Sequence, residues 1–237
     1  MSKEQKVAII TGASQGIGAS LATAFRDRGY KIVATSRSIQ PSDSADFVTV
    51  AGDIADPKTA ERVVQAAIEH FGRIDTLVNN AGIFVAKPFT DYTLEDYNNV
   101  VATNVAGFFH ISQRAAAQML KQGSGHIVSV STSLVDQPIK GVPAAMASIS
   151  KGAINAVTRS LAIEYADKGI RVNTVAPGII KTPMHAPENQ DFLAKLHPMG
   201  RMGEIGEIVD AVLYLDQAAF VTGEILHVDG GQHAGRW

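Results

Sequence analysis

Residues 6–20 read KVAIITGASQGIGAS and carry three local signals in direct succession. The first six residues form a short β-branched run, which is typical of a strand buried on both faces. The glycines Gly12, Gly16 and Gly18 then mark a turn, and a helix is expected over 17–28. Residues 7–25 carry no charge, but a glycine-rich break at this spacing ends a strand, so we expect neither a signal peptide nor a membrane span there.

The same alternation of strand and helix continues along the chain of 237 residues. A predicted helix over 57–71 has a proline at its start and Gly72 just after its end, which are common boundary signals. Strands that alternate with helices pair in parallel through right-handed crossovers, so we predict the α/β class. The expected architecture is a single doubly wound Rossmann domain over 1–237, with a seven-stranded parallel sheet and helices on both faces. The strands are predicted at 6–11, 31–36, 47–50, 76–79, 126–130, 171–176 and 225–228, and the other helices at 94–121, about 144–168 and 205–215.

Composition excludes several classes of function. The formal net charge is −2, from 21 basic and 23 acidic residues with no block of like charges, so we expect no nucleic-acid partner and no membrane partner. The chain has no cysteine, which excludes disulfides, thiolate zinc sites and a cysteine nucleophile and favours a cytoplasmic location. The seven histidines show no tight ligand spacing, so no metal site is expected.

An irregular stretch over 179–204 separates the sixth predicted strand from the last predicted helix. Its three prolines and two glycines indicate no regular structure, and it is too long for an ordinary connection. Ligands of open α/β sheets bind beyond the carboxyl ends of the strands, which is where this stretch begins. We therefore predict that residues 179–204 form a lid.

The glycine turn is a candidate phosphate site, because its backbone can approach a pyrophosphate at the start of a helix. The spacing Gly-x3-Gly-x-Gly is a weak signal alone, but four more features follow it in a fixed order. They are Asn79-Asn80-Ala81-Gly82 after the fourth strand, Asn104 in the next helix, Lys151 in the helix after that, and Pro177-Gly178 after the sixth strand. With these motifs in this order, the chain resembles the short-chain dehydrogenase/reductase family over essentially its whole length.

That resemblance implies a nicotinamide dinucleotide cofactor. The glycines would face the pyrophosphate, Asp53 and Ile54 the adenine, and residues 80–82 the adenosine ribose side. Pro177, Gly178, Ile180 and Thr182 would lie along the nicotinamide and its carboxamide. The cofactor-binding residues expected from the motifs are Gly12, Ser14, Gln15, Gly16, Ile17, Gly18, Ser36, Arg37, Asp53, Ile54, Asn80, Ala81, Gly82, Lys151, Pro177, Gly178, Ile180 and Thr182.

The end of the second strand indicates which cofactor is preferred. A site for NAD presents Asp or Glu there to the ribose 2′-hydroxyl, whereas a site for NADP presents a cation to the 2′-phosphate. The residues at this place are Ser36 and Arg37, so a carboxylate is absent and a guanidinium is present. We predict NADP(H).

The catalytic residues follow the family pattern only in part. By the resemblance, the family carries a Ser, an Asn and a Tyr-x-x-x-Lys pair, and Lys151 and Asn104 occupy two of these positions. The tyrosine position is Ala147, and none of the five tyrosines lies in 131–146, so no local shift in register restores the motif. The serine position is open between Thr132, selected by counting from the strand, and Ser133, favoured by counting back from Ala147.

The missing tyrosine leaves several readings of the reaction open. General acid catalysis contributes roughly 10²–10⁴ in rate, so its loss weakens ketone reduction without forbidding hydride transfer. Another proton donor could act, and the candidates are Lys151, a water beside Ala147, Asp136, His185 and His197. Alternatively the substrate is an iminium or conjugated enoyl compound that needs no strong acid, or the protein is a binding scaffold or sensor for NADP(H), or a structural subunit of a mixed oligomer.

The sequence thus predicts a cytoplasmic NADP(H)-dependent oxidoreductase with an atypical active site. Hydride would pass between the nicotinamide and a carbonyl or alcohol carbon of a small-molecule substrate. The helices predicted at 94–121 and about 144–168 match those through which family members assemble, which implies a homotetramer or homodimer.

Overall fold

A computed structural model of the chain describes residues 5–185 and 187–235. Its centre is a seven-stranded sheet in the order β3-β2-β1-β4-β5-β6-β7, and every pair of neighbours is parallel. The predicted fold class is confirmed, and each predicted strand is present with bounds shifted by at most two residues. The strands are β1 Val7–Thr11, β2 Lys31–Ser36, β3 Phe47–Ala51, β4 Thr76–Asn79, β5 Gly125–Val130, β6 Ile170–Pro177 and β7 Ile225–Val228.

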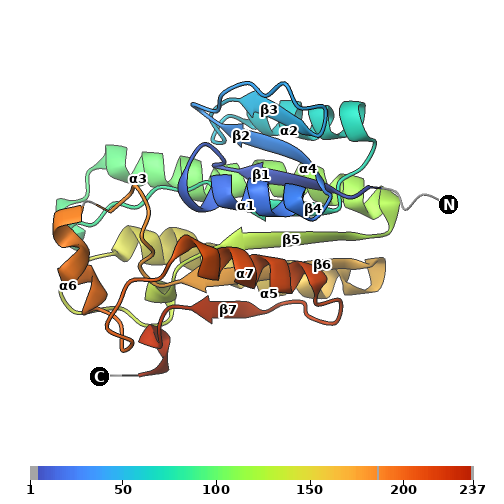
Figure 1. The fold of residues 1–237 in the computed structure, drawn as a ribbon. Coiled ribbons are helices and arrows are strands. Elements are labelled where there is room, and N and C mark those ends of the chain that lie inside the picture. Colours follow the sequence, from blue (N-terminus) through green and yellow to red (C-terminus); the bar gives the residue numbers. More distant parts are fainter. Residues whose placement is uncertain (1–4, 186, 236–237) are drawn as a thin grey trace.

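Helices cover both faces of this sheet (Figure 1). One apolar core lies under α1 and α7, and the other lies under α2, α4 and α5. Strand β1 contributes Ala8 and Ile10 to the first core and Val7 and Ile9 to the second, which explains why its sequence is apolar throughout. The helices are α1 Gly16–Asp27, α2 Pro57–Phe71, α3 Leu94–Val100, α4 Gly107–Gln122, α5 Ala145–Tyr165, α6 Gln190–Ala194 and α7 Ile205–Gln217. None of the helices in the described part of the chain is long and apolar enough to cross a membrane.

Two stretches differ from the sequence prediction. The helix expected over 94–121 is divided into α3 and α4 by a π-helical segment, Val101–Ala106. This segment contains Asn104, whose buried side chain bonds the backbone of Ile83 instead of facing solvent. The stretch 179–204 is not wholly irregular, because α6 lies within it beyond the carboxyl ends of the strands (Figure 1).

A buried polar cluster lies at the amino-terminal ends of the strands, opposite the end at which α6 lies. Tyr30 and Thr76 donate hydrogen bonds to the Asp216 carboxylate at 2.7 and 2.6 Å. His126 Nδ1 faces the same carboxylate at 3.5 Å, and its Nε2 lies 3.2 Å from the amide nitrogen of Asn173. Burial opposes the charge on Asp216, but its contacts with His126, Thr76 and Tyr30 outweigh this effect and lower its pKa to about 2. Burial also lowers the pKa of His126, so the ring is neutral at pH 7 with Nε2 as the acceptor.

This neutral histidine predicts a loss of stability in mild acid. The unfolded chain protonates His126 near pH 6.5, whereas the folded chain resists protonation until lower pH, so stability falls as pH drops below about 6.5. Between pH 7 and pH 5, His126 lowers the free energy of unfolding by up to about 2 kcal/mol. Urea unfolding should show this extra loss in the wild type and not in His126→Gln, which loses a fixed amount at both pH values. An equal loss of stability between pH 7 and pH 5 in the wild type and His126→Gln would contradict a neutral, buried His126.

Candidate functional site

The turn between β1 and α1 is built to receive a phosphate group. Gly12 and Gly16 have φ values of 67° and 57°, in the region that favours glycine. A Cβ on Gly12 would lie 2.9 Å from the Ala81 Cα, and one on Gly18 would lie 2.3 Å from the Gly12 carbonyl oxygen, so neither position accepts a side chain. Helix α1 starts here without a side-chain cap from Gln15, which leaves its positive end open to an anion. These features fit a dinucleotide pyrophosphate.

The end of β4 is bonded directly to this turn. The Asn80 side chain donates to the carbonyl oxygens of Thr11 and Gly12 at 3.0 and 3.2 Å. The Thr11 hydroxyl oxygen in turn accepts the backbone N–H groups of Asn80 and Ala81, both at 3.0 Å. Residues 80–82 are therefore brought against the glycine turn, as the motif order predicts.

Lys151 and Asn104 meet beside Gly82. A Cβ on Gly82 would lie 3.1 Å from Lys151 Nζ and 3.3 Å from Asn104 Oδ1. Asn104 accepts the Ile83 N–H at 2.8 Å and donates to the Ile83 carbonyl at 2.9 Å, and Lys151 Nζ donates to the Val130 carbonyl at 2.7 Å. Burial lowers the pKa of Lys151 to about 8, so the ammonium is still protonated at pH 7 and gives up a proton more easily than an exposed lysine does.

Ala147 lies in the first turn of α5, one helical turn before Lys151, and is 5% exposed. Residues four apart share a helix face, so Ala147 and Lys151 point the same way. Among the described residues, no tyrosine hydroxyl is bonded to Lys151, Asn104 or Thr132. Tyr30 is engaged by Asp216, and the Tyr92 hydroxyl donates to the Val85 carbonyl.

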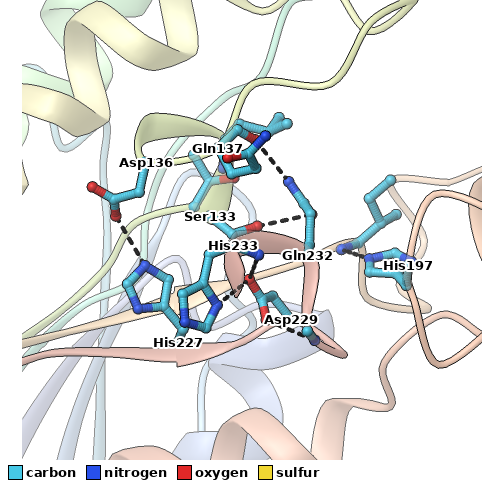
Figure 2. Close-up of polar contacts among 12 residues, drawn as sticks. Ser133, Asp136, Gln137, His197, His227, Asp229, Gln232 and His233 are labelled. Carbon is cyan, nitrogen blue, oxygen red and sulfur yellow. Dashed lines mark hydrogen bonds and ion pairs between the residues drawn. The ribbon is translucent and has the colours of Figure 1, made fainter. Parts of the chain in front are cut away.

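The two candidate hydroxyl groups after β5 have different surroundings. Ser133 is fully buried and donates to the Gln232 side chain at 2.9 Å (Figure 2). Thr132 is half-buried, and its oxygen accepts the Leu134 N–H at 3.3 Å, which leaves its hydroxyl proton available to another acceptor. Sequence reasoning missed Gln232, because no local pattern relates two residues 99 positions apart.

The segment from Pro177 to Thr182 leads from the end of β6 to the glycine turn, which its last residue approaches. Gly178 donates its N–H to the Val228 carbonyl at 3.0 Å, and Ile180 is buried and bridges to Gly203. A Cβ on Gly16 would be in ordinary contact with Thr182, at 3.8 Å. The predicted carboxamide side and the predicted pyrophosphate turn are therefore adjacent in space.

The remaining predicted cofactor residues lie at the edge of the same region. Asp53 accepts the Ala55 N–H at 3.0 Å, and Ile54 is buried. Arg37 directly follows β2, is exposed, and has no hydrogen bond or ion pair to another described residue. In the turn itself Ser14 and Gln15 are exposed, and Ile17 is half-buried against the core.

The alternative proton donors are each engaged in a local contact. Asp136 pairs with His227 at 2.9 Å (Figure 2), and His185 Nδ1 lies 2.9 Å from the Ile180 carbonyl. His197 Nε2 accepts the Ile179 N–H at 2.9 Å. Across residues 5–185 and 187–235, no group of three or more His, Cys, Asp or Glu side chains could hold a metal ion.

Comparison with known proteins identifies the family. A family model described as enoyl-(acyl carrier protein) reductase matches residues 12–233. An uncharacterized oxidoreductase of Thermotoga maritima is 38% identical, with 99% of this chain and 100% of the relative covered. The 3-oxoacyl-(acyl-carrier-protein) reductase FabG of Escherichia coli K12 is 36% identical, with coverage of 98% and 99%.

Solved structures agree with these relatives. ElxO with NADP bound superposes with a TM-score of 0.91 at 29% identity, covering 98% of this chain and all of that one. The 3-ketoacyl-(acyl-carrier-protein) reductase from Brucella melitensis complexed with NADH gives a TM-score of 0.89 at 30% identity, with coverage of 97% and 99%. Together with the parallel sheet, the glycine turn and the Lys151–Asn104 pair, these matches show that the chain belongs to the short-chain dehydrogenase/reductase family of oxidoreductases.

Proposed function

We propose that the protein is an NADP(H)-dependent oxidoreductase that transfers hydride between the nicotinamide and a carbonyl or alcohol carbon of a small molecule. The observation that carries this proposal is the convergence of the uncapped glycine turn, Lys151 and residues 177–182 at one edge of the sheet. The phosphorylated cofactor is supported by the NADP-bound neighbour ElxO and by the exposed Arg37, which pairs with no other described residue. The cofactor supplies the hydride when it is bound.

The residues of the chain bind and orient the reactants in this proposal. The backbone around Gly12 and Gly16 holds the pyrophosphate, and Lys151 contacts the nicotinamide ribose. Thr132 is the better candidate to donate a hydrogen bond to the substrate carbonyl, because the hydroxyl proton of Ser133 is already given to Gln232. Residues 179–204 act as the lid, and the nearness of Thr182 to the glycine turn, 3.8 Å from where a Cβ on Gly16 would lie, supports this role.

Two variants separate the roles of the neighbouring hydroxyl groups. Thr132→Val should lower kcat for a ketone about 100-fold, because a donor aimed at the developing oxyanion is lost. Ser133→Ala should keep kcat and destabilise the fold by about 1–3 kcal/mol, because the buried Gln232 oxygen loses its donor. Steady-state kinetics and urea unfolding of both variants measure these effects, in the wild type or in an active Ala147→Tyr background. The opposite pattern would assign the catalytic hydroxyl to Ser133.

A second candidate function is favoured by Ala147 itself. Without a tyrosine on this face, a substrate that needs no strong acid fits the site better than a simple ketone does, and iminium and conjugated enoyl compounds are such substrates. A panel of ketones, enones and iminium compounds, followed by NADPH consumption, discriminates between these classes. NADPH binding without turnover on the whole panel would favour a scaffold or sensor, or a structural subunit of a mixed oligomer.

The assembly we propose is a homotetramer or homodimer, in the cytoplasm. Helices α4 and α5 expose the large apolar side chains of Phe109, Ile149 and Ile163, which supports a contact between copies through these helices. Light scattering of the purified protein measures the mass in solution, and a monomeric mass would contradict this part of the proposal.

A further inference from the structure

His197 lies within the proposed lid and packs against Gly178 and Gly230, which lie outside it. It is 3% exposed and is seen in Figure 2 beside the carboxyl-terminal turn that contains Asp229 and Gln232. Its Nε2 accepts the backbone N–H of Ile179 at 2.9 Å. Ile179 is the residue between Gly178 and Ile180, in the segment proposed to lie along the nicotinamide.

Accepting this N–H fixes the protonation state of the ring. An imidazole nitrogen that accepts a hydrogen bond carries no proton, so the proton of neutral His197 is on Nδ1. Nδ1 is buried and has no hydrogen-bond partner among the described residues. A second proton would convert Nε2 into a donor that faces the Ile179 N–H, and the contact would be lost.

The ring is also closely packed on both sides. A Cβ on Gly178 would lie 2.7 Å from His197 Nε2, so only glycine allows the segment to approach the ring this closely. On the other side, a Cβ on Gly230 would lie 3.4 Å from the His197 Cβ, and Met199 donates its N–H to the Gly230 carbonyl at 3.2 Å. The N–H of Ile179 is therefore held by His197, which packs against the carboxyl-terminal turn, and the Ile179 carbonyl oxygen accepts the Gly203 N–H at 2.9 Å.

The charges that face His197 act in opposite directions. Burial is the largest effect and lowers its pKa, backbone contacts with Ala194 and Leu193 and the Asp229 carboxylate raise it, and Arg201 lowers it. The Asp229 carboxylate is already shared with His233 Nδ1 at 2.8 Å and with the N–H groups of Gly231 and His233. At neutral pH His197 is therefore in the state that holds Ile179.

We propose that His197 is a positioning residue for the cofactor: its neutral ring holds the backbone at Ile179 over the nicotinamide end of the site, and its protonation releases that backbone and weakens NADP(H) binding. This inference rests on the proposed function for the identity of the ligand. The hydrogen bond by which His197 holds Ile179 is present in the chain without cofactor.

Three variants test the role of this ring. His197→Gln places a carbonyl oxygen that cannot titrate near the position of Nε2, and His197→Leu removes the acceptor. His70→Gln, at an exposed histidine of α2, is the matched control. The first readout is the hydrogen-exchange protection factor of the Ile179 amide without cofactor, at pH 8 and at a series of lower pH values down to pH 4.5. The second is the Kd for NADP⁺ by calorimetry at the same pH values.

At pH 8 the wild type, His197→Gln and His70→Gln should protect Ile179 equally, and His197→Leu should lose about tenfold, as expected for one buried hydrogen bond. Below pH 6.5, as the buried ring becomes protonated, the wild type and His70→Gln should approach the Leu variant, and the Gln variant should not. The Kd for NADP⁺ should follow the same order, again by about tenfold. Because the 2′-phosphate also titrates near pH 6, the pH effect is the difference between the wild type and His197→Gln.

The outcomes separate this inference from the proposed function. Unchanged protection of Ile179 in His197→Leu, or the same pH response in the wild type and His197→Gln, would overturn the role of His197. Protection that follows the expected order without a matching change in a measurable Kd would also overturn it. If the protection of Ile179 follows the expected order but the protein binds no NADP⁺, the result would support the role of His197 in holding Ile179 and contradict the proposed function. If His197→Leu does not fold, the role of His197 is tested by the difference in pH response of Ile179 protection between the wild type and His197→Gln.

Discussion

Ala147→Tyr is expected to raise the rate of ketone reduction by NADPH by a factor of about 10²–10⁴, the usual contribution of a positioned general acid. The new hydroxyl would lie one helical turn from Lys151, whose ammonium, with a pKa of about 8, stabilises a phenolate and returns the proton. The proposal assigns every other role in the hydride site to residues that the chain already has. NADPH consumption at saturating ketone measures the gain.

Ala147→Phe is the matched control, because it adds nearly the same volume without the hydroxyl. Ala147 is buried, so both variants strain the packing around the start of α5 by an amount that urea unfolding measures. The expectation is activity in the tyrosine variant alone. Two folded variants without activity, beside an active wild type, would mean that the chain uses a different donor or an acid-independent substrate. If the wild type and both variants bind NADPH but show no turnover, the protein is better explained as a binding scaffold for NADP(H).

Arg37→Asp is expected to weaken NADPH binding by about 10- to 100-fold, the range for one charge-assisted hydrogen bond to a phosphate. The guanidinium has no hydrogen bond or ion pair to another described residue, so its removal should leave the fold intact. The introduced carboxylate repels the 2′-phosphate and can accept from the ribose 2′-hydroxyl of NADH. The affinity for NADH should therefore stay the same or improve.

Arg28→Asp gives the control for net charge, because Arg28 is an exposed arginine just after α1. It changes the charge of the protein equally and should leave the Kd for NADPH within about twofold, since surface charges at a distance are screened by salt. Titration of both variants by NADPH fluorescence measures the effect. An unchanged affinity in Arg37→Asp would mean that Arg37 is an ordinary solvated arginine and that the cofactor preference has another origin.

The parallel sheet could be predicted because each of its signals is local. A β-branched run of six residues, a glycine turn and a helix boundary are visible within a window of about twenty residues, and their repetition allows few topologies. The absence of a tyrosine at position 147 is equally local, because the distance to Lys151 is one helical turn. The division of the helix over 94–121 could not be predicted, because it depends on a contact between Asn104 and the backbone of Ile83.

The choice between Thr132 and Ser133 has the same origin. Both are hydroxyl residues at the end of a strand, and the chain around them does not distinguish their roles. The distinction comes from Gln232, which the fold brings against Ser133 and which takes its hydroxyl proton. The contact of His197 with Ile179 likewise joins two residues 18 positions apart within the stretch 179–204, which shows no regular pattern in the sequence.

The sequence alone determines the α/β class, the positions of the strands along the chain, the phosphate-type turn and the absence of a tyrosine at position 147. Each of these depends on residues only a few positions apart. Only the tertiary structure assigns the hydroxyl of Ser133 to Gln232, the amide of Asn104 to Ile83 and the ring of His197 to Ile179. The physical reason is that a buried polar group must find a partner, and the packing of distant segments determines which partner is within reach.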